Sequence, residues 1–133
     1  MSQENTDLVR RAVAAFNERD ISTLELLFTE DFLLRVIGGL EAMTGTEFRG
    51  QQSALNWVRD LLDTVGGRLE IETLRGVGDR LLLIATLRTT GAASGAEATW
   101  QIGQVFSFRD RQLSALDSYY TASEALKAVG LAE

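Results

Sequence analysis

The sequence predicts a single α+β domain, residues 1–133, in which a curved antiparallel β-sheet wraps around a long helix. Helical segments come early, and a run of alternating, strand-like segments follows without β-α-β repetition. Residues 51–65 carry apolar side chains at helical spacing, and residues 97–120 form one long predicted hairpin. The chain is 45% hydrophobic, which suits one core. A sheet folded around the helix would enclose a cone-shaped cavity.

Composition and charge exclude several classes of function. The net charge is −6 and no basic stripe exists to neutralise phosphates, so we expect no nucleic-acid partner. The absence of cysteine and histidine excludes disulfides, a thiol nucleophile, a Ser-His-Asp triad and a His/Cys metal site. No carboxylate spacing suggests an all-oxygen metal site, and we expect no cofactor. Without a long apolar run or an apolar leader, we expect a cytoplasmic protein with no membrane contact.

Two helices are predicted at the start of the chain. Residues 3–19 carry an apolar stripe at the i, i+3, i+4, i+7 spacing of one helix face, formed by Val9, Ala12, Val13 and Phe16. A second, short helix is predicted from residue 22 to about 28. Ser22 and Glu25 have the spacing of a capping box, in which Ser22 would cap the helix and Glu25 would reach back to it. Most of these residues are expected to pack in the core.

The middle of the chain combines one strand, a loop and the longest helix. Residues 31–37 alternate as a strand, with the facing of Arg35 left open, and residues 46–48 could add a short strand. Residues 38–47 are expected to form a flexible rim. The helix over 51–65 is the strongest helical pattern in the chain, and two glycines end it. Trp57 lies mid-stripe, where it is expected either in the core or on a pocket wall.

Four strands and a last helix follow. Residues 68–77 and 80–90 alternate on either side of a Gly-Asp turn. In the hairpin of 97–108 and 112–120, one face of the first arm is apolar except for Gln104. An amide in an apolar wall must find a partner or cost free energy, so we look for function there. Thr121 and Glu124 form a second predicted capping box, and Gly130 ends the helix that it opens.

Several of these segments together resemble the SnoaL-like branch of the nuclear transport factor 2-like superfamily. The carriers of the resemblance are the helix over 8–20, Phe-Arg-Gly at 48–50, Gly-Asp-Arg at 78–80, and the ending from Tyr-Tyr at 119–120 to Leu131. The resemblance covers nearly the whole chain and implies a cone-shaped, cystatin-like roll with a mainly apolar pocket. Relatives include ketosteroid isomerases, polyketide cyclases, epoxide hydrolases, dehydratases and non-catalytic binding domains, so the reaction stays open. Relatives commonly have glycine in the last hairpin turn; its absence here predicts positive φ at Asp110 or Arg111.

The catalytic residues of the relatives are not kept. The Asp base, Tyr donor and Asp donor of ketosteroid isomerases correspond by eye to Val36, Ala12 and Gln104, and an amide cannot remove a proton. The Arg and two Asp residues of limonene epoxide hydrolases correspond to Leu81, Leu83 and Ser118. Steroid isomerisation and epoxide hydrolysis by these routes are therefore not expected.

Two functional hypotheses remain. The first is a pocket for a small hydrophobic, aromatic or polycyclic molecule, lined by Phe16, Trp57, Leu61, Trp100, Gln104, Phe106, Ser118 and Tyr120. Such a pocket could also belong to a cyclase, isomerase or dehydratase. Gln104 and Tyr120 would then orient a carbonyl. Either Asp117, expected to point outward, or a group of the substrate would move the proton. The second is a non-catalytic domain that forms a homodimer through its outer sheet face, with Leu82, Ile84, Thr86, Arg88, Thr99, Gln101, Val105 and Ser107.

Overall fold

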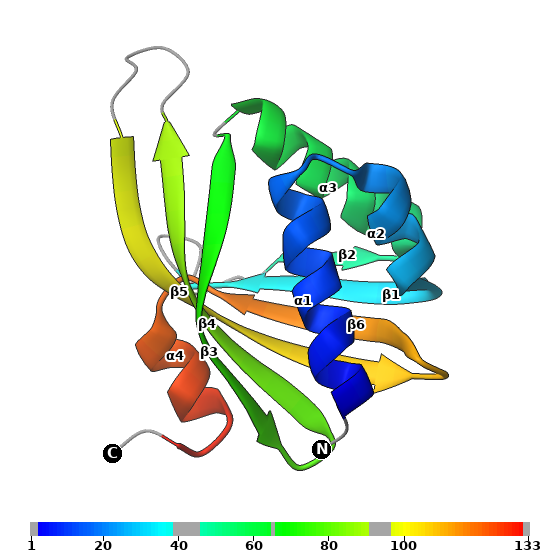
Figure 1. The fold of residues 1–133 in the computed structure, drawn as a ribbon, viewed down its shortest axis with the longest axis vertical. Coiled ribbons are helices and arrows are strands. Elements are labelled where there is room, and N and C mark those ends of the chain that lie inside the picture. Colours follow the sequence, from blue (N-terminus) through cyan, green and yellow to red (C-terminus); the bar gives the residue numbers. More distant parts are fainter. Residues whose placement is uncertain (1–2, 39–45, 65, 91–96, 132–133) are drawn as a thin grey trace.

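A strongly curved sheet with helices on both sides forms the protein (Figure 1). The computed structural model describes residues 3–38, 46–64, 66–90 and 97–131. The helices are α1 (Gln3–Asn17), α2 (Ile21–Leu27), α3 (Gln51–Thr64) and α4 (Ala122–Ala128). The strands are β1 (Phe28–Ile37), β2 (Thr46–Arg49), β3 (Gly67–Val77), β4 (Arg80–Thr90), β5 (Glu97–Arg109) and β6 (Gln112–Tyr119). Helices α1, α2 and α3 lie on the concave side of the sheet and α4 lies on the other side. The predicted α+β roll is confirmed.

The sheet is mixed, whereas the sequence predicted a wholly antiparallel one. Its strand order is β2-β1-β6-β5-β4-β3, and β1 pairs with β6 in parallel while the other neighbours are antiparallel. The parallel pair joins segments about 80 residues apart, as in the register of Arg35 with Asp117. No local pattern could reveal this pairing, because it is fixed by how the intervening helix and strands fold.

The two long helices bury the stripes that the sequence predicts. Val9, Ala12 and Val13 of α1 and Ala54, Val58 and Leu62 of α3 belong to the main core. Leu55 is also fully buried, although it lies beside the predicted stripe. The buried face of α3 is therefore broader than the periodicity indicates, because α2 and β1 both contact this helix.

The predicted capping box at the second helix is wrong. Asp20, not Ser22, is the N-cap residue: its carboxylate accepts from the Thr23 backbone N–H at 3.1 Å, the Thr23 hydroxyl at 2.6 Å and the Ser22 hydroxyl at 3.0 Å. A carboxylate accepts these three donors at once, which a single hydroxyl cannot do. These hydrogen bonds, first of all the one from the Thr23 hydroxyl, lower the pKa of Asp20. The other predicted cap is confirmed, since the Thr121 hydroxyl accepts from Glu124 N–H at 3.2 Å.

The last hairpin has the strained turn that the sequence predicts. Both Asp110 and Arg111 have positive φ, 52° and 64°. Two successive left-handed residues match the right-handed twist of the flanking strands, so the turn closes the hairpin without glycine. A register shift between Ser107 and Phe108 adds a bulge in β5–β6 near this turn.

Helix α4 covers part of the convex face of the sheet. It packs on Leu82, Ile84 and Val105, which are at most 7% exposed. Gly103 makes this close approach possible, because a Cβ there would lie 2.3 Å from the Ala125 Cβ. The expectation that these three apolar residues lie on an open outer face is therefore wrong: the chain's own last helix covers them.

Two further expectations concern the periphery. The predicted flexible rim falls mostly on residues 39–45, which lie outside the described residues. Within the described ranges, no helix is long and apolar enough to cross a membrane.

Candidate ligand cavity

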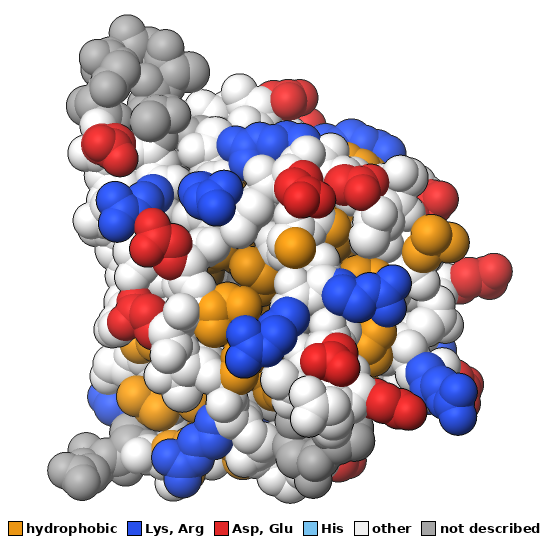
Figure 2. Space-filling view, viewed as in Figure 1, with side chains coloured by type: hydrophobic (Ala, Val, Ile, Leu, Met, Phe, Trp, Pro, Cys, Tyr) orange, Lys and Arg blue, Asp and Glu red, His pale blue; other side chains and the backbone are white. Residues whose placement is uncertain are grey.

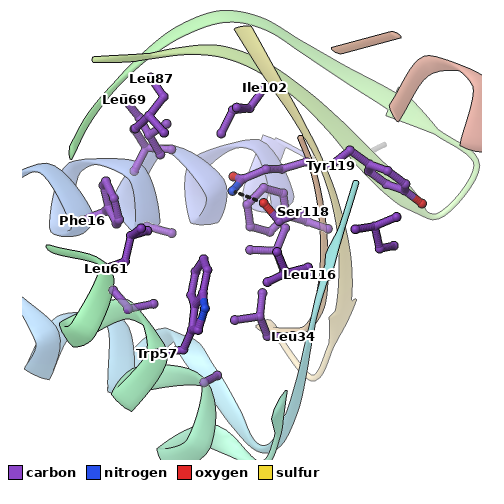
Figure 3. A pocket seen from close by; sticks show the side chains of 18 of the residues that line it. Phe16, Leu34, Trp57, Leu61, Leu69, Leu87, Ile102, Leu116, Ser118 and Tyr119 are labelled. Atoms are coloured by element: carbon purple, nitrogen blue, oxygen red, sulfur yellow. Dashed lines mark hydrogen bonds between the residues drawn. The ribbon is translucent and has the colours of Figure 1, made fainter. Parts of the chain in front are cut away.

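A cavity of about 230 Å³ lies between the concave face of the sheet and helices α1 and α3 (Figure 3). In Figure 3, Phe16 on α1 lies next to Leu69 and Leu87 of β3 and β4, and the ring of Trp57 on α3 stands between them and Leu34 and Leu116. All eight residues proposed as a pocket from the sequence line this one cavity: Phe16, Trp57, Leu61, Trp100, Gln104, Phe106, Ser118 and Tyr120. The structure thus brings together residues from α1, α3, β5 and β6, and Tyr120 just after β6.

The alternation of the strands places these side chains. Gln104 and Ser118 are direct cross-strand partners in β5–β6, so their side chains point to the same face of the sheet. That face lines the cavity. Phe106 pairs with Leu116 two residues further along, and Trp100 pairs with Leu87 across β4–β5. The wall is therefore apolar on both sides of one polar pair.

That polar pair is hydrogen-bonded. The Gln104 side-chain amide donates to the Ser118 hydroxyl oxygen at 3.3 Å, the dashed line in Figure 3. An amide NH₂ has two donors and a hydroxyl has one, so this single bond leaves one N–H of Gln104 and the O–H of Ser118 without a recorded acceptor among the described residues. The amide that the sequence places in an apolar wall therefore has a hydrogen-bond partner for only one of its two N–H groups.

Trp100 also lines the cavity. Its indole N–H is buried and has no partner within the part of the chain that the structure describes. The Trp100 ring lies 6.0 Å from the Tyr120 ring at a tilt of 35°. Tyr120 both lines the cavity and is 52% exposed, so this aromatic pair lies where the cavity meets solvent.

The cavity wall carries almost no titratable chemistry. Among its described lining residues, the only titratable side chains are Tyr119 and Tyr120. In Figure 3 the Tyr119 hydroxyl points away from the other labelled side chains. Burial, the largest cause, raises the pKa of Tyr119, so its hydroxyl stays protonated at neutral pH. The described wall has no carboxylate or amine that could serve as a general base.

Asp117 faces away from the cavity, as its alternation with Ser118 predicts. Its carboxylate accepts two hydrogen bonds from Arg35, from Nε at 2.7 Å and Nη2 at 2.6 Å. The Asp117 side chain is 11% exposed and that of Arg35 is 44% exposed. Asp117 is thus a partner of Arg35 between β1 and β6 on the convex face. The sequence left open which face of the sheet Arg35 occupies. In the structure Arg35 lies on the convex face with Asp117 and does not line the cavity.

Some lining residues were not singled out from the sequence. Leu34, Val36 and Leu116 come from the parallel β1–β6 pair, and Val58 comes from the buried stripe of α3. The alternation of β1 does place Leu34 and Val36 on one face, so the missing information was which strand lies beside β1. No group of three or more acidic side chains positioned for a metal ion occurs within the described ranges.

Comparison with known families identifies the domain. The model of the SnoaL-like domain family matches residues 9–116. The chain belongs to the SnoaL-like family. No curated protein is significantly similar to it in sequence.

Solved structures share the fold of this SnoaL-like domain at low identity. An NTF2-like protein of unknown function from Burkholderia pseudomallei is 21% identical with a TM-score of 0.78, covering 97% of this chain and 98% of that one. An LEH-like epoxide hydrolase from M. tuberculosis is 16% identical with a TM-score of 0.75, covering 96% and 90%. TerC, co-crystallised with polyporic acid, is 17% identical with a TM-score of 0.77, covering 96% and 99%. At these identities the likeness concerns the fold alone.

Proposed function

We propose that this SnoaL-like domain binds a small, neutral, mostly apolar molecule that carries a hydrogen-bond acceptor such as a ketone. The observation that carries the proposal is the donor-rich polar pair, Gln104 and Ser118, set in an otherwise apolar and aromatic cavity. Cavities that bind small molecules commonly combine apolar walls with a few placed polar groups that fix orientation.

The volume of the cavity limits the size of the ligand. An apolar cavity of about 150 Å³ is large enough for benzene. The 230 Å³ found here is about one and a half times that volume. A ligand with one substituted ring or two fused rings fits this space, whereas larger polycyclic molecules would need the cavity to widen. Of the polycyclic ligands expected from the sequence, only those with two fused rings therefore fit the cavity as it is.

The hydrogen-bonding groups of the wall suit a ligand that carries an acceptor. Gln104 and Ser118 each keep one donor without a recorded partner in the described structure. A ligand carbonyl could satisfy both donors and so relieve the cost of burying them unpaired. A ligand carboxylate would be buried without a cationic partner, because no Lys or Arg lines the described wall.

The same wall argues for binding rather than acid–base catalysis. Cyclisation, isomerisation and dehydration move protons, and a positioned base is their usual requirement. Gln104 cannot take a proton, Tyr119 is held neutral, and Asp117 lies behind the sheet with Arg35. TerC, which has the same fold, was co-crystallised with a small organic compound, polyporic acid. We therefore favour a ligand-binding function over an enzymatic function such as that of a cyclase or an isomerase.

The test uses two ligands that differ only in one carbonyl, 1-indanone and indane. Their dissociation constants are measured by quenching of tryptophan fluorescence, since both tryptophans, Trp57 and Trp100, line the cavity. The variant is Gln104→Leu. The matched control is Gln101→Leu on the same strand, because Gln101 is exposed on the convex face and bonds to Glu72.

Both ligands are expected to bind the wild-type domain, 1-indanone with the lower dissociation constant. In Gln104→Leu the preference for 1-indanone should fall by about fivefold, the effect of one lost neutral hydrogen bond of about 1 kcal/mol. Gln101→Leu should keep the wild-type preference. Failure of both ligands to bind the folded domain would overturn the proposal. An unchanged preference in Gln104→Leu would show that Gln104 does not recognise the carbonyl.

A further inference from the structure

A second, open hollow of about 290 Å³ lies at the start of β3, outside the apolar cavity. Its lining is Arg19, Gly66, Gly67, Arg68, Arg88 and Glu97, none of which lines the cavity. Figure 2 shows Lys and Arg side chains close together over the upper ends of β3 and β4, with acidic side chains beside them. Three guanidinium groups thus border one hollow of a chain whose net charge is −6.

Arg19 is held in place at this hollow. Arg19 is the second residue after α1 and has a left-handed backbone conformation, with φ 58°. One terminal nitrogen, Nη1, donates to the Gly67 carbonyl oxygen at 2.9 Å and to the Asn17 carbonyl oxygen at 3.1 Å. The other terminal nitrogen and Nε have no recorded acceptor among the described residues. The guanidinium is therefore anchored on one side and available on the other.

Arg68 and Arg88 stand directly opposite each other in the β3–β4 ladder. Like charges in this position repel and destabilise a sheet. Arg88 is partly compensated, since its Nε donates to Glu70. The Arg68 side chain has no recorded hydrogen bond or ion pair with any residue of the described ranges. The pair thus places unused N–H donors and excess positive charge at one spot.

We infer that this hollow binds an oxyanion of the phosphate type, free or as the phosphoryl group of a small molecule. Guanidinium groups present forked N–H donors that match phosphate oxygens, and an anion between Arg68 and Arg88 would remove their repulsion. The anchored Arg19 would bind the same anion from the side of α1. Glu97 is the opposing group in the hollow, because its carboxylate repels an anion and competes for the same arginines.

The experiment is a titration of the ¹⁵N-labelled full chain with inorganic phosphate at low ionic strength, followed by NMR. Sodium chloride at matched ionic strength is the control titrant. Arg68→Gln tests the site, and Arg75→Gln is the matched control, since Arg75 is exposed further along the same strand and does not line the hollow. Glu97→Gln removes the opposing carboxylate. The spectra themselves report whether each variant is folded.

Saturable shifts centred on residues 66–68 and 88 are expected with phosphate but not with chloride. Arg68→Gln should weaken binding about tenfold, as expected for a lost charge-assisted hydrogen bond, and Glu97→Gln should strengthen it. Arg75→Gln should change it by less than about twofold. Equal effects of the two arginine variants, or equal shifts with chloride, would overturn the assignment. Tighter binding of phenyl phosphate than of inorganic phosphate would indicate an esterified ligand, and equal binding a free anion.

Discussion

The Arg35–Asp117 ion pair should respond unequally to the loss of its two partners. Replacing Arg35 with Met leaves a carboxylate whose side chain is only 11% exposed, whereas replacing Asp117 with Asn leaves a guanidinium that is 44% exposed and can turn toward water. Removal of one partner from a buried pair costs about 3–5 kcal/mol, and an exposed pair is worth about 0–1 kcal/mol. This pair lies between those limits.

From these exposures we expect Arg35→Met to lower the free energy of unfolding by about 2–3 kcal/mol and Asp117→Asn by about 1–2 kcal/mol. The double variant Arg35→Met/Asp117→Leu should be more stable than Arg35→Met, because no unpaired charge stays buried. The measurement is equilibrium unfolding in urea, followed by tryptophan fluorescence. In a domain of this size, each kcal/mol also lowers the Tm by roughly 4 °C.

Ligand binding separates a structural role of Asp117 from a role in the cavity. Asp117→Asn should leave the dissociation constant of 1-indanone unchanged when the domain is folded, since the carboxylate lies on the convex face. If Asp117→Asn proves as destabilising as Arg35→Met, the reasoning from unequal exposure is wrong. If it abolishes ligand binding in a folded domain, the placement of Asp117 outside the site is wrong.

Two further predictions concern the packing and capping of helices. Gly103→Ala should destabilise the domain by about 1–3 kcal/mol, because its new methyl group would collide with the Ala125 Cβ. Adding Ala125→Gly should restore part of that loss. If urea unfolding shows that the losses of the two variants simply add, this contact does not limit the packing. Asp20→Asn tests the cap. The pKa of Asp20 is lowered in the folded state, so its carboxylate stabilises the fold above about pH 4. That stabilisation is lost as the pH falls through the lowered pKa. The stability difference between wild type and Asp20→Asn should therefore shrink on acidification, and a difference independent of pH would refute the role of the charge.

The sequence by itself determined the local structure and much of the cavity wall. Periodicity located the helices and strands because burial of one face imposes a period of 3.6 or 2 on the apolar residues. The same alternation put Ser118 and Asp117 on opposite faces, and the resemblance to relatives then implied that Ser118 faces inward and Asp117 outward. The missing glycine in the last turn, where relatives commonly have one, was enough to predict positive φ at Asp110 or Arg111, and both residues have it.

Only the tertiary structure decided the contacts between distant segments. The parallel β1–β6 pair, the ion pair of Arg35 with Asp117 and the packing of α4 over Gly103 join residues far apart in the chain. The arginine hollow at β3 escaped notice because its charges lie in different elements, and folding alone brings them together. The cap at Asp20 was missed for a local reason, since Ser22 and Glu25 also have the spacing of a cap.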